Sequence, residues 1–149
     1  MESQIEQMRG VLVSLNGGKI LLPNTTVSEI ITYAAPESVE GKPAWYLGAI
    51  RWKGYRLPLV SFSTMVGWQQ SETLSGAKVA ILKALSGETK MPYFAILTQG
   101  FPRLLNITSD QLLDDPDHGN AYYFSGYYND DSISVPNLEA VEKEIREYL

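Results

Sequence analysis

The fold class that the sequence predicts is mainly β, with two small lobes of one design and a helix at the C-terminus. Short apolar segments alternate with turn-forming residues along the chain, as in sheets and small barrels. Two segments share a pattern in which a glycine precedes a proline by ten residues, Gly48 with Pro58 and Gly126 with Pro136. From Asn137 the apolar residues recur at helical spacing instead.

Length and composition fit one compact unit. The chain has 149 residues, of which 44% are hydrophobic and 19% charged, and a chain of this size buries most of its apolar surface on folding. We interpret residues 1–149 as a single domain. It divides into a first lobe at 10–67, a second lobe at 77–136 and a helix at 137–148.

The charge pattern disfavours two classes of partner. The formal net charge is −5 and the chain has no run of lysines or arginines, so nucleic acid and membrane surfaces are poor partners. No apolar stretch is long enough to cross a bilayer, and residues 1–7 are acidic and polar where a signal peptide is basic and then apolar. We therefore expect a cytoplasmic protein. The absence of cysteine fits a reducing compartment and excludes a thiol nucleophile.

The first lobe is predicted to begin with a hairpin. Apolar residues alternate over 11–15 and resume over 20–22, and residues 16–18 (Asn-Gly-Gly) between them accept positive φ. Residues 27–33 are rich in β-branched side chains and predict a strand, with a helical turn as an option at its start. Residues 34–43 contain two prolines and a glycine and predict a loop.

A second hairpin is predicted at residues 46–60, with its turn at Lys53 and Gly54. Residues 61–67 predict a short helix that ends at a glycine, and the polar residues 68–76 are expected to join the lobes.

The second lobe is predicted from apolar segments that turn-rich segments separate. Its expected strands are 79–85, 91–97, 103–107, 122–128 and 133–135.

The predicted C-terminal helix is amphipathic. Asn137 is of the residue type that caps helix N-termini, and Glu139 lies in the first turn. The apolar positions are Leu138, Val141, Ile145 and Tyr148, and the polar positions opposite them are Glu142, Lys143, Arg146 and Glu147. We expect the apolar face to pack on the protein's own sheet, and docking on a partner is the alternative.

The sequence contains no obvious catalytic residues. His118 is the only histidine, so a second imidazole for a zinc site is missing, and the four aspartates between 110 and 117 lack the full calcium-loop pattern. Nucleotide-binding and serine-hydrolase motifs are absent. Pairing of Glu29 with a loop aspartate for hydrolysis has no support from spacing. We therefore predict no enzyme activity, no metal and no cofactor.

The second hairpin is rich in residue types that dominate binding energy at protein interfaces. They are Trp45, Tyr46, Trp52, Lys53, Tyr55 and Arg56. Strand alternation requires about half of them to face inward, and the sequence does not say which half.

The same region carries a family resemblance. Residues 27–30 (Val-Ser-Glu-Ile) match a valine-x-glutamate-hydrophobic step. Residues 47–60 align, without a gap, with a hairpin of the form apolar-x-Gly-apolar-x-x-x-Arg-Gly-x-hydrophobic-hydrophobic-Pro-hydrophobic, in which Lys53 stands at the arginine position and Arg56 at the first hydrophobic position. Residues 10–23 also fit the start of the family. In these features the chain resembles the bacterial CheW-like chemotaxis coupling proteins.

The resemblance implies two five-stranded, SH3-like β-barrels side by side, and a scaffold that is not an enzyme. It implies two partners, the regulatory domain of a CheA-type histidine kinase and the cytoplasmic tip of chemoreceptors. The protein would then lie in the cytoplasm, associated with membrane receptor arrays.

The resemblance also implies site residues. Receptor contact falls at Val27, Glu29, Gly48, Lys53 and Gly54. Lys53 stands where the family normally has arginine, and an ammonium lacks the planar two-point fork of a guanidinium. Receptor groups held in two-point fashion would therefore be held less well.

Kinase contact is expected at Tyr55, Arg56 and Leu57, on the strand that follows the same turn. This expectation places the two partners on adjacent parts of one hairpin.

Three further positions depart from the family pattern. Ser61 replaces an aspartate, residues 98–99 (Thr-Gln) replace a valine-aspartate pair, and residues 136–137 (Pro-Asn) replace a leucine-aspartate pair. These departures suggest a divergent accessory member from a chemosensory system that controls pili or surface motility.

Two other functions remain open from the sequence. The first alternative is a two-barrel domain that binds an unrelated peptide or small ligand, which a deep apolar pocket would favour. An enzyme is the third hypothesis and would require a cluster of ionisable groups with perturbed pKa values.

Overall fold

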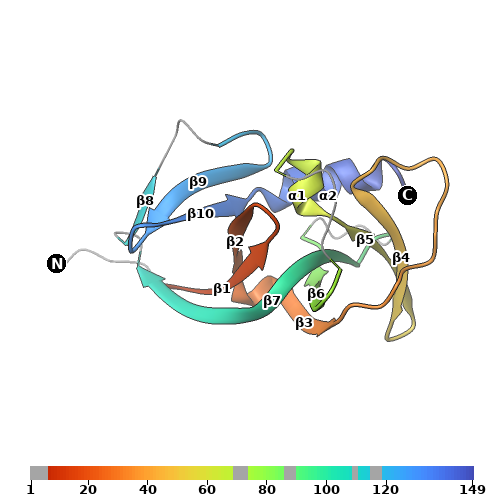
Figure 1. Ribbon diagram of the computed structural model, residues 1–149, viewed down its shortest axis with the longest axis horizontal. Helices are drawn as coiled ribbons and strands as arrows, with labels where there is room; N and C mark the ends of the chain where they lie inside the picture. The colour runs from red at the N-terminus through yellow and green to blue at the C-terminus, as the bar shows by residue number, and fades with distance from the viewer. Residues whose placement is uncertain (1–6, 69–73, 86–89, 109–110, 115–118) are drawn as a thin grey trace.

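The ten strands found in the described residues form one sheet. The computed structural model describes residues 7–68, 74–85, 90–108, 111–114 and 119–149. The main path of pairing runs β3-β6-β7-β1-β2-β10-β9-β8, and β4 joins through β5, which pairs with β7 (Figure 1). The strands are β1 (Gln7–Leu15), β2 (Gly18–Pro23), β3 (Val27–Thr32), β4 (Tyr46–Trp52), β5 (Tyr55–Val60), β6 (Ala77–Lys83), β7 (Tyr93–Thr108), β8 (Leu112–Asp114), β9 (Tyr123–Tyr128) and β10 (Asp131–Pro136). The helices are η1 (Asn24–Thr26), α1 (Phe62–Met65) and α2 (Leu138–Arg146).

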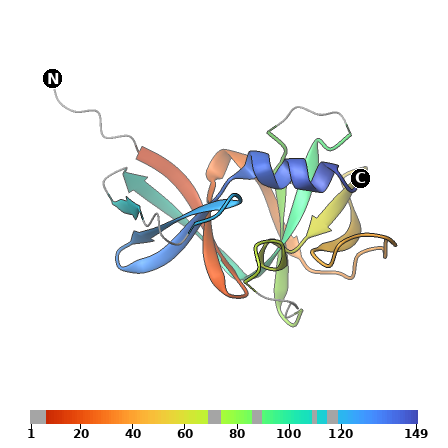
Figure 2. The ribbon, with the colours of Figure 1, turned by 90° about the horizontal axis from the view of Figure 1, so that it is seen from above.

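The strands gather into two subdomains that lie side by side (Figures 1 and 2). The first contains β3, β4, β5, β6 and the start of β7, and the second contains β1, β2, β8, β9, β10 and the end of β7. This pairing departs from the predicted division into 10–67 and 77–136. The N-terminal hairpin joins the C-terminal strands because β2 pairs in parallel with β10, at Ile20 and Ser134.

Strand β7 links the subdomains. The sequence predicts separate strands at 91–97 and 103–107, but residues 93–97 and 103–107 lie within this single 16-residue strand. Its first part pairs with β6 and its second with β1, and Gln99 is opposite both Ala77 and Ser14. Gly100 has a φ of 68° and the register with β1 shifts nearby. A bend of this kind lets one strand change partners without ending.

The two Gly-to-Pro segments form hairpins of the same kind. The β4–β5 turn consists of Lys53 (φ 47°) and Gly54 (φ 84°), and the β9–β10 turn of Asn129 (φ 49°) and Asp130 (φ 68°). Two central residues with positive φ are typical of a type I′ turn, whose twist matches that of the flanking strands. The predicted repeat is therefore present in the backbone of both turns.

Helix α1 follows the first of these hairpins and is short because it is capped at both ends. The Ser61 hydroxyl oxygen accepts a hydrogen bond from the Thr64 backbone N–H at 3.1 Å, which satisfies an N-terminal amide. Gly67, with a φ of 85°, follows the helix in the left-handed conformation that ends helices.

Helix α2 packs on the protein's own sheet, as expected. Asn137 Oδ1 accepts a hydrogen bond from the Ala140 N–H at 3.2 Å, and Leu138, Val141 and Ile145 are buried in the main core. The helix runs from the end of β10 towards the first subdomain (Figure 2). It therefore covers apolar side chains that neither group of strands buries alone.

The prediction that Glu142 lies on the polar face of α2 is wrong. Its exposed fraction is 0%. The carboxylate accepts a hydrogen bond from the Leu85 backbone N–H at 2.8 Å, and its other oxygen lies 3.8 Å from Arg146 Nη1. The sequence pattern could not reveal this role, because the amide that needs an acceptor lies just beyond β6.

Replacing Glu142 with alanine is expected to lower the free energy of unfolding by about 1–3 kcal/mol, because the Leu85 backbone N–H loses its acceptor. Urea unfolding followed by circular dichroism measures the loss. Lys143→Ala, at an exposed position on the next residue, is the control and should change stability by no more than about 0.5 kcal/mol. Equal stability of the two variants would show that the Glu142 contact contributes nothing.

Candidate functional site

The β4–β5 hairpin presents three of its six interface-type residues to solvent. Lys53, Tyr55 and Arg56 are exposed. The other three, Trp45, Tyr46 and Trp52, are half-buried. The exposed set therefore gathers at the turn and at the start of β5, which resolves the question that strand alternation alone left open.

A charged cluster lies at the tip of this hairpin. Trp52 Nε1 donates a hydrogen bond to Glu29 Oε1 at 2.9 Å, and Lys53 Nζ lies 3.7 Å from the same oxygen. The ammonium also lies 5.2 Å from the centroid of the Trp52 ring, within range of a cation–π contact. The structure thus brings together the predicted receptor residues Glu29 and Lys53.

These contacts cross a gap in the sheet. In the described residues β3 pairs with β6 and β4 pairs with β5, and no ladder joins β3 to β4. The first subdomain is therefore a barrel that backbone pairing leaves open along one side. The side chains of Trp52 and Glu29 join the two edge strands near the tip, where half-buried Val27 begins β3.

Aromatic packing holds the tip in place. Trp52 and Tyr55 are cross-strand partners whose rings stack at 6.3 Å and 26°. Tyr93 of β7 contacts both, with centroids 4.9 Å from Trp52 and 5.1 Å from Tyr55. Packing against Tyr55 and Tyr93 therefore fixes the position of the Trp52 indole, which in turn orients the Glu29 carboxylate.

Two predicted contact residues are buried. Leu57 is 1% exposed and belongs to the core of the first subdomain. Gly48 is buried under the loop at 34–43, where Glu37 and Ala49 exchange backbone hydrogen bonds of 2.7 and 3.0 Å. A Cβ on Gly48 would lie 2.3 Å from the Glu37 carbonyl oxygen. The absence of a side chain at Gly48 therefore permits the close approach of the loop to β4.

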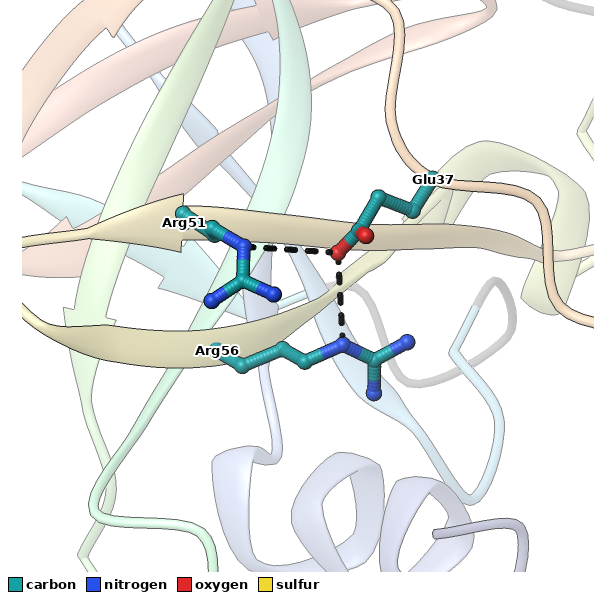
Figure 3. A network of polar contacts seen from close by, with 3 residues as sticks. All are labelled: Glu37, Arg51 and Arg56. Carbon is teal, nitrogen blue, oxygen red and sulfur yellow. Dashed lines mark hydrogen bonds and ion pairs between the residues drawn. The ribbon is translucent and has the colours of Figure 1, made fainter.

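The outer face of the hairpin carries a second charged group, which we name the arginine pair. Arg51 and Arg56 are cross-strand partners, and the Glu37 carboxylate lies between them (Figure 3). Glu37 Oε1 lies 3.3 Å from Arg56 Nε and 3.8 Å from Arg51 Nε. The side chains are 51% exposed for Glu37, 55% for Arg56 and 75% for Arg51.

Sequence reasoning missed Arg51 and Glu37 as site residues. A two-residue turn at Lys53 and Gly54 fixes the register of the hairpin, so the pairing of Arg51 with Arg56 could have been read from the turn. Glu37 lies in an irregular loop, and no pattern in the sequence indicates where that loop folds.

A groove lies beside the arginine pair, in the gap between β3 and β4. Its volume is about 310 Å³. The lining residues are Ile31, Thr32, Ala34, Ala35, Glu37, Ala49, Ile50, Arg51 and Val79. Aliphatic side chains form most of this wall, while Glu37 and Arg51 lie at its polar side.

Exposed apolar side chains also occur on strands of the second subdomain and along β7. They are Phe101 (82% exposed), Leu104 (70%), Leu113 (63%), Phe124 (65%) and Tyr127 (39%). Exposed apolar side chains gathered on neighbouring strands are characteristic of surfaces that meet other proteins.

The described residues offer little for catalysis. Within them, no group of three or more His, Cys, Asp or Glu side chains could hold a metal ion, and His118 and three of the four loop aspartates lie outside them. Burial raises the pKa of Tyr46, with Arg56 opposing the shift, and burial with the Glu144 carboxylate raises the pKa of Tyr122. Both phenols therefore stay protonated at neutral pH.

Comparison with known protein families gives a match that includes the hairpin. The sequence pattern of the CheW-like domain matches residues 9–145. This chain belongs to the CheW-like domain family. Membership of this family supports a role for the chain as a scaffold or coupling adaptor in chemotaxis signalling.

The fold is similar to that of a solved member. A crystal structure of the scaffolding protein TtCheW from Thermoanaerobacter tengcongensis superimposes with a TM-score of 0.75 at 14% sequence identity, covering 93% of this chain and 89% of that one. The match supports the two β subdomains and the C-terminal helix. No curated protein sequence matches the chain. Among the described residues, no helix has the length and apolar character needed to span a bilayer.

Two departures from the family pattern have local structural roles in this CheW-like chain. Ser61, in place of an aspartate, caps α1 and is fully buried. Asn137, also in place of an aspartate, caps α2. Both residues accept the same kind of hydrogen bond that an aspartate would accept, without its charge.

Replacing Gly48 with alanine should destabilise the first subdomain, because the new Cβ overlaps the Glu37 carbonyl oxygen. We expect a loss of about 2 kcal/mol or more in the free energy of unfolding. Gly41→Ala is the matched control: its φ of 74° adds conformational strain, but no atom lies within 4 Å of the new Cβ. A Gly48→Ala variant as stable as the control would contradict the close approach.

Proposed function

We propose that this CheW-like chain is a non-enzymatic adaptor that couples chemoreceptors to a CheA-type histidine kinase in the cytoplasm, at membrane receptor arrays. The observation that carries the proposal is the family match over residues 9–145, which includes the hairpin with its ordered, exposed tip. The surface offers charged and aromatic side chains suited to protein contacts.

The receptor contacts the tip of the hairpin. Glu29, Lys53 and Gly54 are exposed there, and Val27 supports them from the start of β3. Trp52 holds the Glu29 carboxylate in position, so a receptor helix meets a preorganised charge pair. Gly48 is buried under the loop at 34–43, so it contributes indirectly, by letting this loop pack against the hairpin.

The kinase regulatory domain contacts the start of β5. Tyr55 and Arg56 are exposed and combine a large contact area with a polar group. Leu57 supports them from the core. The exposed apolar residues of the second subdomain offer a further surface for packing against a related β domain.

A role in an accessory system that controls pili or surface motility is part of the proposal. It is supported by Lys53, since an ammonium in place of the family's guanidinium alters how a receptor carboxylate or carbonyl is held. The partner would then be a receptor whose tip accepts a single-point contact.

Binding to a CheA-type regulatory domain from the same organism tests the kinase half of the proposal. We expect saturable binding by calorimetry, weakened about tenfold by Tyr55→Ala because an interface tyrosine contributes buried area that alanine lacks. Lys83→Ala, exposed on β6, is the control and should bind as the unaltered protein does. No binding to any such kinase domain would refute the coupling role.

The Lys53→Glu variant tests the receptor half. It places a second carboxylate beside Glu29, so we expect at least about fivefold weaker binding of a receptor tip fragment. Lys53→Arg restores the family residue and should bind as tightly as lysine or more tightly. Circular dichroism separates unfolding from lost contact, and equal affinity of the Glu and Lys forms would exclude this position as a contact.

A further inference from the structure

We infer that the arginine pair and the adjoining groove bind an acidic segment of a partner protein, and that the Glu37 carboxylate occupies the pair until that segment arrives. The inference deepens the proposed function and rests on it for the claim that the partner is a protein. The segment would carry an aliphatic side chain next to an aspartate or glutamate.

The charges of this face favour an acidic partner. Two guanidinium groups lie opposite each other on paired strands, and the structure places one carboxylate, that of Glu37, between them. The chain as a whole has a net charge of −5, so a local excess of positive charge stands out against its surroundings. Like charges directly opposite on a sheet are unfavourable unless a counter-charge joins them.

Glu37 is held in a way that a competitor can replace. Its Oε1 atom serves both arginines through their Nε atoms, at 3.3 and 3.8 Å, and all three side chains are more than half exposed. Neither contact is the two-point fork that makes arginine–carboxylate pairs strong. Exposed pairs of this kind contribute only about 0.2–1 kcal/mol in measured cases.

The backbone of Glu37 can stay in place while its side chain leaves. The backbone exchanges two hydrogen bonds with Ala49, whereas the carboxylate makes its contacts only on the exposed outer face. Release therefore requires side-chain rotation and no opening of the loop. This makes Glu37 a mimic of the incoming carboxylate, supplied by the chain itself.

The groove determines what accompanies the acidic residue. Its volume of about 310 Å³ is at the small end of ligand clefts, and Ile31, Ile50 and Val79 provide an aliphatic wall. Arg51 and Glu37 line the same groove. One short segment can thus place an aliphatic side chain in the groove and a carboxylate on the arginines.

The test uses a fluorescein-labelled, capped peptide of sequence Leu-Glu-Glu-Leu and its Leu-Gln-Gln-Leu counterpart, titrated with the full chain by fluorescence anisotropy. Glu37→Gln keeps the size of the side chain and removes its charge. Glu40→Gln removes an exposed charge from the same loop and is the matched control. Arg51→Gln combined with Arg56→Gln removes the arginine pair.

We expect Glu37→Gln to tighten binding of the acidic peptide about twofold to fivefold at low salt, with no change for the glutamine peptide or for the Glu40→Gln control. The double arginine variant should bind both peptides equally weakly. The inference is overturned if Glu37→Gln fails to tighten acidic-peptide binding, if both peptides bind it equally, or if neither binds at all.

These outcomes are separable from the fate of the proposed function. Kinase binding with no preference for the acidic peptide would leave the adaptor role standing and exclude the arginine pair as its acidic-segment site. Acidic-peptide binding without any kinase or receptor binding would keep the site and remove the coupling role. Vesicles with and without phosphatidylserine complete the set, since tighter binding to the anionic vesicles than to the peptide would point to a membrane and overturn the protein partner.

Discussion

Pairing of one long strand with both subdomains is the constraint on which the structure depends. Strand β7 is bonded to β6 and β5 over its first part and to β1 over its second, and Gln99 is opposite a residue of each subdomain. The main core follows from this sharing, because it collects side chains from both sets of strands and from α2. The two subdomains are therefore joined both by backbone hydrogen bonds and by a common core.

The candidate site arises where backbone pairing stops. A closed barrel would satisfy the edges of β3 and β4 through a ladder, whereas here a groove of about 310 Å³ lies between them and side chains bridge it at the tip. An open edge costs the protein hydrogen bonds and creates a risk of unwanted strand pairing. The hydrogen bond from Trp52 to Glu29 and the loop that carries Glu37 cover this edge with a bulky ring and with charged side chains. Aromatic and charged side chains of this kind are also suited to contacts with other proteins.

The sequence predicted most of the elements but not how they combine. The hairpins, the glycine that ends α1 and the Asn137 cap of α2 follow from local signals such as turn chemistry and capping. Glu29 and Lys53 are instead singled out by the family resemblance, as expected receptor contacts. The pairing of β2 with β10 depends on contacts distant in the chain, and the short strand β8 has too few residues to give a pattern. The contacts of Glu142 and Glu37 could not be predicted for the same reason. Each acts on a group brought close only by the fold, so a charged residue that seemed solvated proved to be a partner.

The N-terminal hairpin has a consequence for how this chain folds during synthesis. Strands β1 and β2 leave the ribosome well before β10, yet β2 pairs with β10. All strands from β3 to β9 must be made before the second subdomain can close, and contacts so distant in sequence form slowly because a long loop must be ordered first. The nascent hairpin would meanwhile expose apolar side chains that are buried at the end, among them Ile20 and Leu22. Folding during synthesis therefore favours protection of β1 and β2 until β10 appears.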